Sequence, residues 1–474
     1  MTEILKPDIC VIGAGSGGLT VAAGASRMGA ATVLIESGRM GGDCLNYGCV
    51  PSKALIAAAH AAEAVRGAGR FGVEAGEPKV DFARVRAHVQ GVIAAIAPMD
   101  SVERFEGLGV RVIRATARFA GPDEVVADGI RVRARRFVVA TGSTPLVPPI
   151  PGLDAVPYRT NETIFDATVR PERLVIIGGG PIGCELAQAF RRLGAAVAIV
   201  EMRSILPKDD LEAVEIVRRQ LQAEGVAIHE TTEVIGVEKT AAGFALLVRK
   251  DGASARIEGT DLLVAAGRRP TVAGLDLEAA GIAHGPLGIV VDARLRTGNR
   301  RVYALGDVTG GYQFTHMAGY QAGIVLRKAL FRLPAKVDHR AVPWVTFTDP
   351  ELAQVGLTEA AARAAAGDIR VLRRPFSEND RAQTERRIDG FVKLVTTRRG
   401  RVLGATIVGA QAGELVHLWG LAIARRLSVG AVAGMIAPYP TRGELNKRAA
   451  GGFYEPVLFG PRTRFLVRFL RLFG

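Results

Sequence analysis

The chain is poor in cysteine, histidine and tryptophan, and it has no long apolar run. Its 474 residues include four Cys, seven His and two Trp. Zinc sites usually take four ligands and no second Cys/His cluster occurs, so we expect no resident metal. No run of eighteen apolar residues exists, so we expect no transmembrane helix. A structural disulfide is also not expected, because the sequence carries no secretory signal.

Basic residues exceed acidic residues without gathering into one block. Lys and Arg number 61 against 47 Asp and Glu, which gives a formal net charge of +14. No nucleic-acid-binding motif accompanies this charge, so we expect no nucleic-acid partner. The excess can still attract acidic substrates or a membrane surface. A Gly-rich motif that begins at Gly13 leaves no room for a cleavable signal peptide, so we expect a cytoplasmic protein.

Two of the four cysteines lie close together near the N-terminus. Cys44 and Cys49 are separated by four residues, one of which is glycine. This spacing lets the chain fold back far enough for a disulfide, and a cycling dithiol needs one stabilised thiolate. We expect a helix over residues 53–66, started by Pro51 and Ser52, whose positive end lowers the pKa of the Cys49 thiol. The pair therefore predicts redox chemistry.

The other two cysteines have simpler surroundings. Cys10 lies in an apolar strand and Cys184 in a Gly-rich helix, so we interpret both as packing residues.

A dinucleotide-binding pattern occurs twice. Each copy has an apolar strand, a GxGxxG turn that opens a helix, and a second apolar strand that ends in Glu. The first copy contains Gly13, Gly15, Gly18 and Glu36, and the second contains Gly178, Gly180, Gly183 and Glu201. The first glycines of the two copies are 165 positions apart, and so are the two acids, which argues against chance turns.

Two such modules predict two dinucleotides. Glycines let the pyrophosphate approach the backbone, and the acid binds a ribose hydroxyl. A dithiol exchanges two electrons, so a flavin is the natural intermediary between it and a nicotinamide hydride. We therefore place FAD on the first module, beside the cysteines, and NADH or NADPH on the second. Glu201 favours NAD because a 2′-phosphate would meet a carboxylate there, although Arg203 softens this preference.

These motifs resemble the class I pyridine nucleotide-disulfide oxidoreductases, such as dihydrolipoamide dehydrogenase, glutathione reductase and mercuric reductase. The resemblance runs from Asp8 to about Tyr454 and includes three further motifs, Val138–Ser143, Val264–Pro270 and Val302–Asp307. It implies an α/β fold with two Rossmann-like dinucleotide-binding domains, for FAD and NAD(P), plus a C-terminal α+β dimerisation domain. The implied division is an FAD-binding domain over residues 1–150 and 271–340, an NAD(P)-binding domain over 151–270, a dimerisation domain over 341–460 and a tail over 461–474.

The resemblance also implies roles for individual residues. Cys49 would meet the flavin ring, and Cys44 would exchange with the substrate. Lys53 and Glu185 match an ion pair near the flavin. Asp307 matches the acid that bonds the ribityl chain. Further cofactor-binding residues implied by the motifs are Thr141, Gly142, Gly267 and Arg268, and a helix starting near Thr315 would point its positive end at the flavin.

The sequence departs from the disulfide-reducing members near its C-terminus. Those members carry a His, donated by the partner subunit of a homodimer, as general acid and base. Tyr439 stands at that place, and Glu444 keeps the family's acid. A phenol with a pKa of about 10 is a poor proton shuttle at neutral pH. Mercuric reductase also has Tyr there, and two thiolates suit a soft ion such as Hg(II).

The sequence therefore favours a mercuric-reductase-like homodimer, although the usual C-terminal Cys pair is missing. Its acceptor is a disulfide, a metal ion or a small electrophile. Two alternatives stay open. One is a dihydrolipoamide dehydrogenase that oxidises a dithiol with NAD. The other is a membrane-tethered protein that delivers electrons or binds a partner.

The C-terminal region has its own patterns. Residues 391–395 and 401–408 predict a β-hairpin, and residues 412–427 predict an amphipathic helix. In the tail, Arg464, Arg468 and Arg471 share one helical face and the remaining residues are apolar. This pattern is typical of a helix on an anionic membrane surface, or of a helix docked on the protein body.

Overall fold

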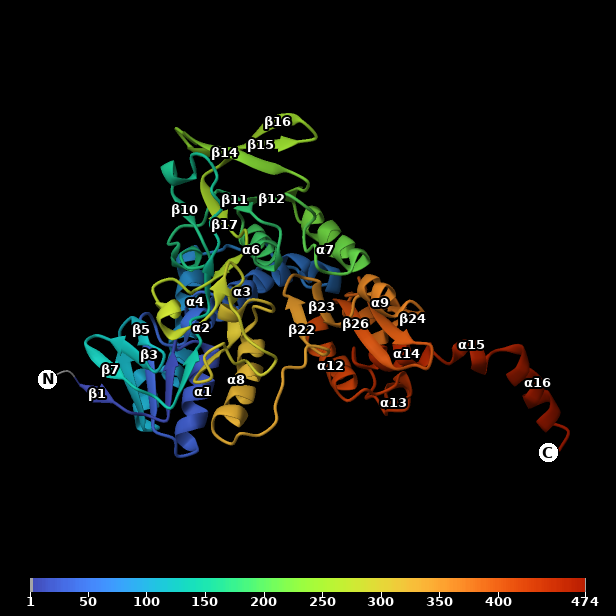
Figure 1. Ribbon diagram of the computed structural model, residues 1–474. Helices are drawn as coiled ribbons and strands as arrows, with labels where there is room; N and C mark the ends of the chain where they lie inside the picture. Colours follow the sequence, from blue (N-terminus) through green and yellow to red (C-terminus); the bar gives the residue numbers. More distant parts are fainter. Residues whose placement is uncertain (1–2, 474) are drawn as a thin grey trace. The chain divides into compact units, whose positions relative to one another are not determined.

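The structure is a computed structural model that describes residues 3–473 (Figure 1). The chain forms two compact units. The first contains the residues up to Met202 together with Ala227–Val337, and the second contains Arg203–Val226 together with the residues from Asp338 onward. These units divide the chain differently from the four-part division expected from the sequence, which stays a prediction. The fold is mixed α/β, as predicted.

The first unit contains a five-stranded parallel sheet around the first glycine motif. Its order is β21 (Val302–Ala304), β8 (Arg136–Val139), β2 (Ile9–Ile12), β3 (Thr32–Glu36) and β4 (Val110–Arg114). Side chains of β2 alternate between two cores, with Ile9 in one and Cys10 in the other. The strands of a parallel sheet that is buried on both faces have continuous apolar sequences, which is why these strands were predictable.

Helices cover one face of this sheet, and a small sheet covers the other. Helices α1 (Ser16–Arg27) and α8 (Thr315–Ala329) pack together and share one core with β2. The opposite core includes Phe119 and Phe137. Phe119 comes from the four-stranded sheet, whose strands are β1 (Ile4–Leu5), β7 (Ile130–Val132), β6 (Glu124–Ala127) and β5 (Ala117–Gly121).

A second parallel arrangement surrounds the second glycine motif. The five-stranded sheet runs in the order β10 (Tyr158–Arg159), β17 (Asp261–Val264), β11 (Arg173–Ile177), β12 (Ala196–Val200) and β13 (Val226–His229). Helix α6 (Pro181–Arg192) follows β11, and Cys184 is fully buried in it. A three-stranded antiparallel sheet of β14 (Glu233–Thr240), β15 (Gly243–Lys250) and β16 (Ala253–Gly259) accompanies it. The predicted packing roles of Cys10 and Cys184 agree with their burial.

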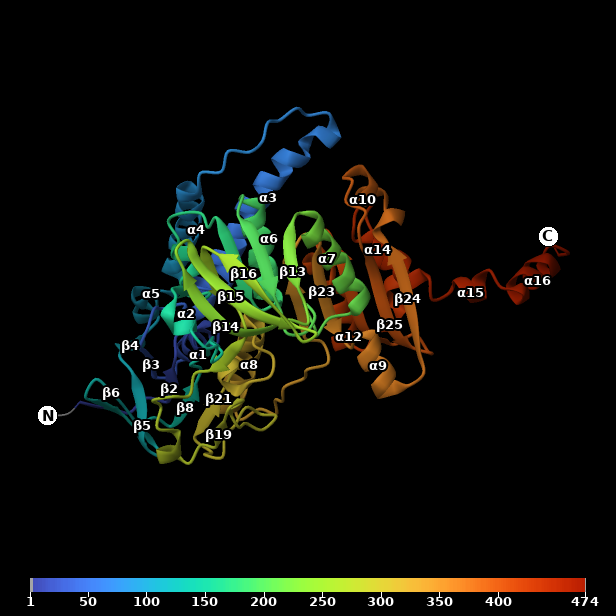
Figure 2. The ribbon, with the colours of Figure 1, turned by 90° about the horizontal axis from the view of Figure 1, so that it is seen from above.

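Further helices and strand pairs complete the first unit. Helix α3 (Cys49–Gly67) packs against α4 (Phe82–Ile96) and α6, as Figure 2 shows. The remaining helices and strand pairs are α2 (Gly42–Asn46), α5 (Val102–Gly107), β9 (Ser143–Pro145) with β18 (Arg268–Pro270), and β19 (His284–Gly285) with β20 (Gly288–Ile289).

The second unit is built on an antiparallel sheet. Its order is β22 (Pro343–Thr346), β23 (Glu351–Gly356), β26 (Val402–Gly409), β25 (Phe391–Thr397) and β24 (Ile369–Pro375). Strands β25 and β26 form the predicted hairpin. Its helices are α9 (Glu359–Ala366), α10 (Asp380–Thr384), α11 (Ala412–Leu415), α12 (His417–Ala424), α13 (Val429–Ala433), α14 (Glu444–Gly451), α15 (Glu455–Leu458) and α16 (Pro461–Leu470).

The helix predicted over residues 412–427 is shorter and divided. It is split at Val416, whose carbonyl accepts from the amide of Trp419, three residues on, in addition to that of Gly420. It ends at Ala424 because Arg426 takes a left-handed φ of 56°, which a continuing helix does not tolerate. Trp419 is fully buried in the core, and its indole donates to Asn446 at 2.8 Å.

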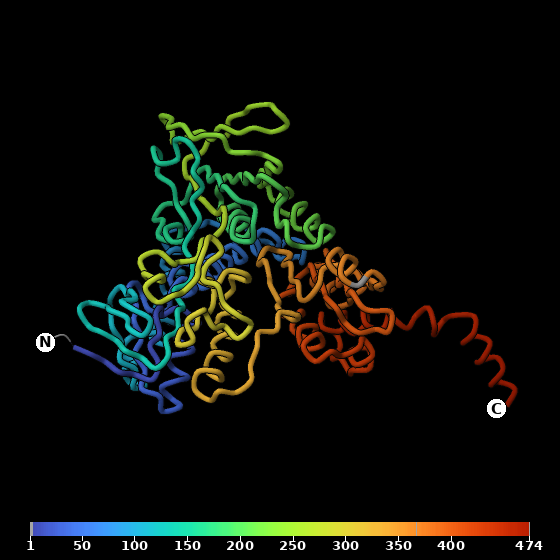
Figure 3. The backbone as a smooth tube through the Cα atoms, in the orientation of Figure 1, coloured from blue at the N-terminus to red at the C-terminus, as the bar shows by residue number. Residues whose placement is uncertain are grey.

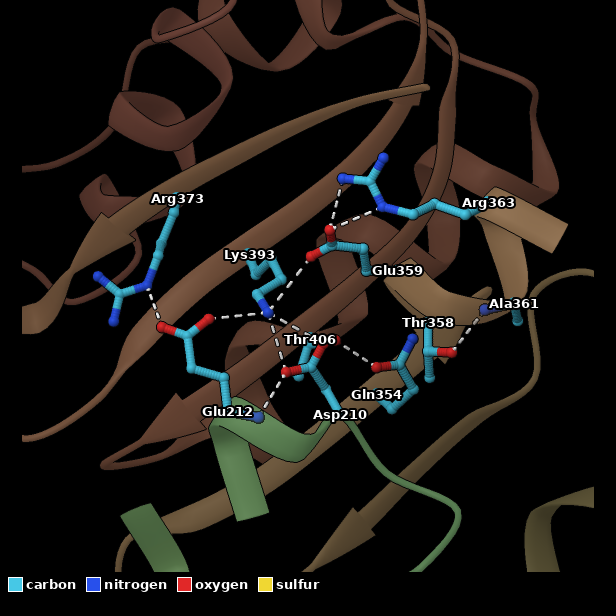
Figure 4. A network of polar contacts seen from close by, with 10 residues as sticks. All are labelled: Asp210, Glu212, Gln354, Thr358, Glu359, Ala361, Arg363, Arg373, Lys393 and Thr406. Carbon is cyan, nitrogen blue, oxygen red and sulfur yellow. Dashed lines mark hydrogen bonds and ion pairs between the residues drawn. The ribbon is translucent and has the colours of Figure 1, made fainter. Parts of the chain in front are cut away.

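Helix α7 (Leu211–Ala223) belongs to the second unit, although it connects β12 and β13. A buried lysine anchors it there (Figure 4). Lys393 Nζ lies 2.9 and 3.0 Å from the two oxygens of Asp210, which caps α7, and 2.8 Å from Glu212. The side chains of Lys393 and Asp210 are each 7% exposed. Burial of such a charge is tolerated because carboxylates surround it.

The C-terminal helices α15 and α16 form the last red stretch of the tube in Figure 3. Neither helix contains a buried residue. No helix between residues 3 and 473 has both the length and the apolarity that crossing a bilayer requires.

Candidate functional site

The two cysteines lie in consecutive helices of the first unit. Cys44 lies within α2, and Cys49 is the first residue of α3. The helix begins four residues before the predicted Lys53, because the amide of Ser52 already bonds to the carbonyl of Gly48 at 3.1 Å. The Cys49 thiol therefore occupies the first turn rather than a position ahead of the helix.

The dithiol loop abuts the first glycine turn. Gly42 has a φ of 59°, and a Cβ added there would lie 2.7 Å from the Cα of Gly15. A side chain at this position would push the loop and the turn apart. Glycine at position 42 thus lets the cysteines approach the place where the first dinucleotide was predicted.

The two thiols differ in electrostatics. Both are free, and Cys49 Sγ lies 3.3 Å from the hydroxyl of Thr315, the first residue of α8. The hydrogen bond from Cys44, together with Thr315 and the charge of Lys53, lowers the pKa of Cys49 to about 6 against the effect of burial. The same thiol–thiol hydrogen bond and burial raise the pKa of Cys44. At neutral pH the pair therefore holds a thiolate on Cys49 and a proton on Cys44.

The predicted Lys53–Glu185 ion pair is present. Lys53 Nζ lies 2.6 Å from Glu185 Oε2, and the Glu185 side chain is only 6% exposed. The contact joins α3 of the dithiol to α6 of the second glycine motif.

Both glycine motifs form open cradles at helix N-termini. A Cβ on Gly18 would lie 1.9 Å from the carbonyl oxygen of Gly13, and one on Gly183 would lie 2.0 Å from that of Gly178. These glycines permit close packing of helix on strand. A Cβ on Gly15, in contrast, would meet nothing within 4 Å, and the same holds for Gly180.

The acids at the strand ends lie beside these turns. Glu36 Oε2 accepts the amide of Ala14 at 2.5 Å, and Glu201 Oε2 accepts the amide of Gly179 at 2.7 Å. Open space at the positive end of a helix, closed on one side by an acid, fits a pyrophosphate and its ribose. The residues present therefore fit two dinucleotides.

The other predicted cofactor residues meet at one place. Arg268 Nε donates to the hydroxyl of Ser143 at 2.7 Å, and that hydroxyl donates to Asp307 Oδ2 at 2.6 Å. Burial raises the pKa of Asp307. Thr141 lies nearby in sequence and donates to the carbonyl of Thr271 at 2.7 Å. The two glycines predicted with them, Gly142 and Gly267, have φ angles of 71° and 130°.

Tyr439 and Glu444 lie in the second unit. The Tyr439 hydroxyl donates to Asp380 Oδ2 at 3.0 Å, and the residue is 68% exposed. The hydrogen bond to Asp380 raises the pKa of Tyr439. Glu444 lies 3.0 Å from Arg448 at the start of α14. How the two residues relate to the cysteines stays a prediction.

Sequence reasoning missed three polar residues of the first unit. Asp43 and Asn161 contact each other at 3.0 Å, and Ser143 links Arg268 to Asp307. Asp43 had a usable signal, since it directly precedes Cys44. Asn161 had none, because it lies 118 positions from its partner. Within the described residues, no three His, Cys, Asp or Glu side chains gather as a metal site requires.

Two ranges of the chain match known family descriptions. Residues 7–322 match the family described as pyridine nucleotide-disulphide oxidoreductase, and residues 342–450 match its dimerisation domain. The mercuric reductase of Streptomyces lividans is 36% identical over 95% of this chain and 97% of its own length. The dihydrolipoyl dehydrogenase of Thermus scotoductus is 35% identical over 95% of this chain and 98% of its own length.

Solved structures agree with this assignment. LpdA from Mycobacterium tuberculosis superposes with a TM-score of 0.86 at 27% identity, covering 94% of this chain and 99% of its own. The HOCl-induced flavoprotein disulfide reductase RclA from Escherichia coli has a TM-score of 0.84 at 28% identity over the same shares. A structure of RclA as a Cu(II) complex has also been solved. The chain therefore belongs to the pyridine nucleotide-disulphide oxidoreductases, a family of FAD-dependent enzymes that use a pyridine nucleotide.

Proposed function

We propose that this enzyme takes electrons from NAD(P)H through FAD to the Cys44–Cys49 disulfide, and that the resulting dithiol reduces an acceptor. Bound flavin would supply the link between the hydride of NAD(P)H and the two electrons that a disulfide takes up. The observation that carries the proposal is the pair of free thiols in the segment that packs against the first glycine turn, with the Thr315 hydroxyl 3.3 Å from the Cys49 sulfur. Cys44 keeps its proton and is the sulfur that meets the acceptor.

The surrounding residues serve this chemistry by binding and positioning. Lys53 places a positive charge near the Cys49 sulfur, and Glu185 holds that lysine in place. Thr315 donates its hydroxyl to the thiolate. Asp307 is suited to bind a hydroxyl of the ribityl chain, and Ser143 orients its carboxylate.

We further propose that the acceptor is a soft metal ion or a small electrophile that reacts with thiolates directly. Tyr439 supports this choice, because its phenol is bonded to a carboxylate that raises its pKa and makes it a poorer acid. Relatives named mercuric reductase, and the Cu(II) complex of RclA, point the same way. A disulfide acceptor, or the reverse oxidation of dihydrolipoamide with NAD, is the alternative that the relatives named dihydrolipoyl dehydrogenase support.

Two assays on one preparation separate these functions. NADPH or NADH oxidation is followed with Hg(II) as acceptor, and NAD reduction is followed with dihydrolipoamide. Turnover with Hg(II) at least tenfold above that with dihydrolipoamide supports the proposal. The opposite ranking rejects it in favour of the dehydrogenase. Activity that survives Cys44→Ser in both assays would reject dithiol chemistry altogether and favour a binding or electron-delivery role.

NADH is the proposed nucleotide. The carboxylate of Glu201 lies at the end of the second cradle, where a 2′-phosphate would meet it. Anaerobic titration with NADH and with NADPH ranks the two. A lower concentration of NADPH at half reduction would contradict this choice.

We propose that two chains form a homodimer in which Tyr439 and Glu444 complete the partner's dithiol site. The match to the dimerisation domain indicates the homodimer, and the exposure of Tyr439 suits a residue that a partner covers. Heterodimers of a C44S chain and a Y439F chain test the arrangement. If each site combines Cys44 of one chain with Tyr439 of the other, one site carries both substitutions and the second site is intact.

The tail supports a separate proposal, peripheral contact with an anionic membrane. Arg464 and Arg468 of helix α16 and its C-cap Arg471 follow one another at the spacing of one helical face, and Phe465 and Phe469 are 71% and 47% exposed. Such a helix lies in the headgroup region of a bilayer. Flotation of the enzyme with phosphatidylserine vesicles is compared with that of a variant ending at Gly460. Equal flotation of the two proteins would reject membrane contact.

A further inference from the structure

The carboxylate of Asp43, the residue before Cys44, packs against Gly48 in the loop between the two cysteines. Its Oδ1 atom is 3.0 Å from Arg268 Nη2 and accepts a hydrogen bond from Asn161 Nδ2 at 3.0 Å. Asn161 is 7% exposed and also donates to the carbonyl of Tyr47 at 3.2 Å. The Oδ2 atom lies 2.8 Å from the position that a Cβ on Gly48 would take. The side chain thus occupies the space that a larger residue before Cys49 would need.

Arg268 connects this carboxylate to the proposed flavin-binding acid. Its side chain is 13% exposed. It donates through Nη2 to the carbonyl of Ser143 at 2.8 Å, and through Nε to the hydroxyl that bonds Asp307. A continuous set of polar contacts therefore runs from the dithiol loop to Asp307.

The charges in this set are not balanced. One guanidinium faces two carboxylates, since Arg268 Nε lies 3.9 Å from Asp307 and Nη2 contacts Asp43. Burial acts to raise the pKa of both thiols, and the charge of Asp43 acts in the same direction on both as a smaller cause. A residual negative charge beside the sulfurs opposes a second negative charge on Cys49.

We propose that Asp43 is a positioning residue for the dithiol, which fixes the loop from Cys44 to Cys49 and disfavours its reduced form. The proposal rests on the redox role proposed above for the two cysteines. Reduction breaks the Sγ–Sγ bond and adds two electrons, supplied by NAD(P)H through the flavin, and one proton. The proton stays on Cys44 and the negative charge on Cys49. Removal of the Asp43 charge therefore stabilises the reduced pair.

The test measures the redox equilibrium of the pair in the flavin-loaded enzyme. Wild type, Asp43→Asn and the exposed control Asp154→Asn are equilibrated in dithiothreitol redox buffers. The oxidised fraction is read by mass after alkylation, which reports sulfur and not flavin. We expect Asp43→Asn to shift the equilibrium about three- to tenfold toward the dithiol, which is about 15–30 mV for a two-electron couple. Arg268→Gln, which leaves the carboxylates without their cation, should shift it the other way.

The outcomes separate this proposal from the proposed function. If the wild-type pair does not equilibrate between disulfide and dithiol, the proposed function itself fails. If it does, and Asp43→Asn titrates like wild type and Asp154→Asn, only the role of Asp43 is overturned. A purely structural role would lower the stability of Asp43→Ala and leave the potential of Asp43→Asn unchanged. Retained flavin in Asp43→Asn, checked by absorbance, excludes indirect loss of the cofactor as the cause.

Discussion

The most direct quantitative prediction concerns the ionisation of Cys49. Its hydrogen bond from Cys44, helped by Thr315 and Lys53, places its pKa at about 6. About nine tenths of the thiol is then ionised at pH 7, against about 3% of an ordinary thiol with a pKa of about 8.5. The lower pKa also weakens the nucleophile, by about 13-fold for a Brønsted slope of about 0.45. The two effects nearly cancel at pH 7, where Cys49 should react only about twofold faster than an ordinary thiol. At pH 6 its reaction should be about tenfold faster.

The pH midpoint is therefore more informative than the rate at neutral pH. Alkylation of the reduced enzyme with iodoacetamide is followed from pH 4.5 to 9, and mass analysis of peptides assigns the modified sulfur. We expect a midpoint near 6 for Cys49. Thr315→Val should raise that midpoint, because it removes a donor to the thiolate, and Thr315→Ser should not. A midpoint above about 8, in the ordinary thiol range, or equal midpoints for both variants, would refute the reasoning.

The same shift makes stability depend on pH. Because the folded-state pKa of Cys49 lies below its unfolded value, its contribution is complete above the ordinary thiol range and is lost as pH falls through about 6. The reduced enzyme should therefore gain stability from pH 6 to 9 relative to Cys49→Ser, as urea denaturation at each pH can measure.

Three further predictions follow from the geometry. Gly18→Ala should abolish flavin retention, because its Cβ would lie 1.9 Å from a carbonyl oxygen, whereas Gly183→Ala should retain flavin and lose NADH binding; identical behaviour of the two would contradict the assignment of the cradles. Lys393→Met should lower the free energy of unfolding by about 3–5 kcal/mol, because it leaves the buried carboxylate of Asp210 without its cation, and adding Asp210→Asn should recover part of the loss in urea denaturation. Tyr439→His should raise dihydrolipoamide oxidation relative to Tyr439→Phe in a steady-state assay, because imidazole titrates near neutral pH; no gain would speak against Tyr439 as the reason for low disulfide activity.

Local patterns in the sequence predicted the parts of the fold that local forces determine. The two glycine motifs fix strand, turn and helix within about 25 residues, and the structure places Glu36 and Glu201 at matching strand ends. The start of α3 was placed too late because Pro51 and Ser52 are common helix starters, while the hydrogen bond that opens the helix comes from the backbone of Gly48.

Long-range contacts were beyond such reasoning. Arg268 reaches Asp43 across 225 positions, and no periodicity or motif relates the two. The Cys pair, the glycines and the Lys53–Glu185 pair were predictable because motif and family resemblance carried them. The carboxylate of Asp43 was not predictable, because its partner Arg268 is positioned only when β18 pairs with β9.

The anchoring of α7 has a practical consequence for protein engineering. The stretch from Arg203 to Val226 separates two neighbouring strands of one sheet, yet its helix is held by Lys393 of another part of the chain. A chimera that imports residues 151–270 from a relative keeps Lys393 but replaces its partner Asp210, so the contact survives only if the relative also has an acid at that position. Recombination between such enzymes should therefore transfer positions 210 and 393 together, or crossovers at seemingly natural borders will yield hybrids that fold poorly.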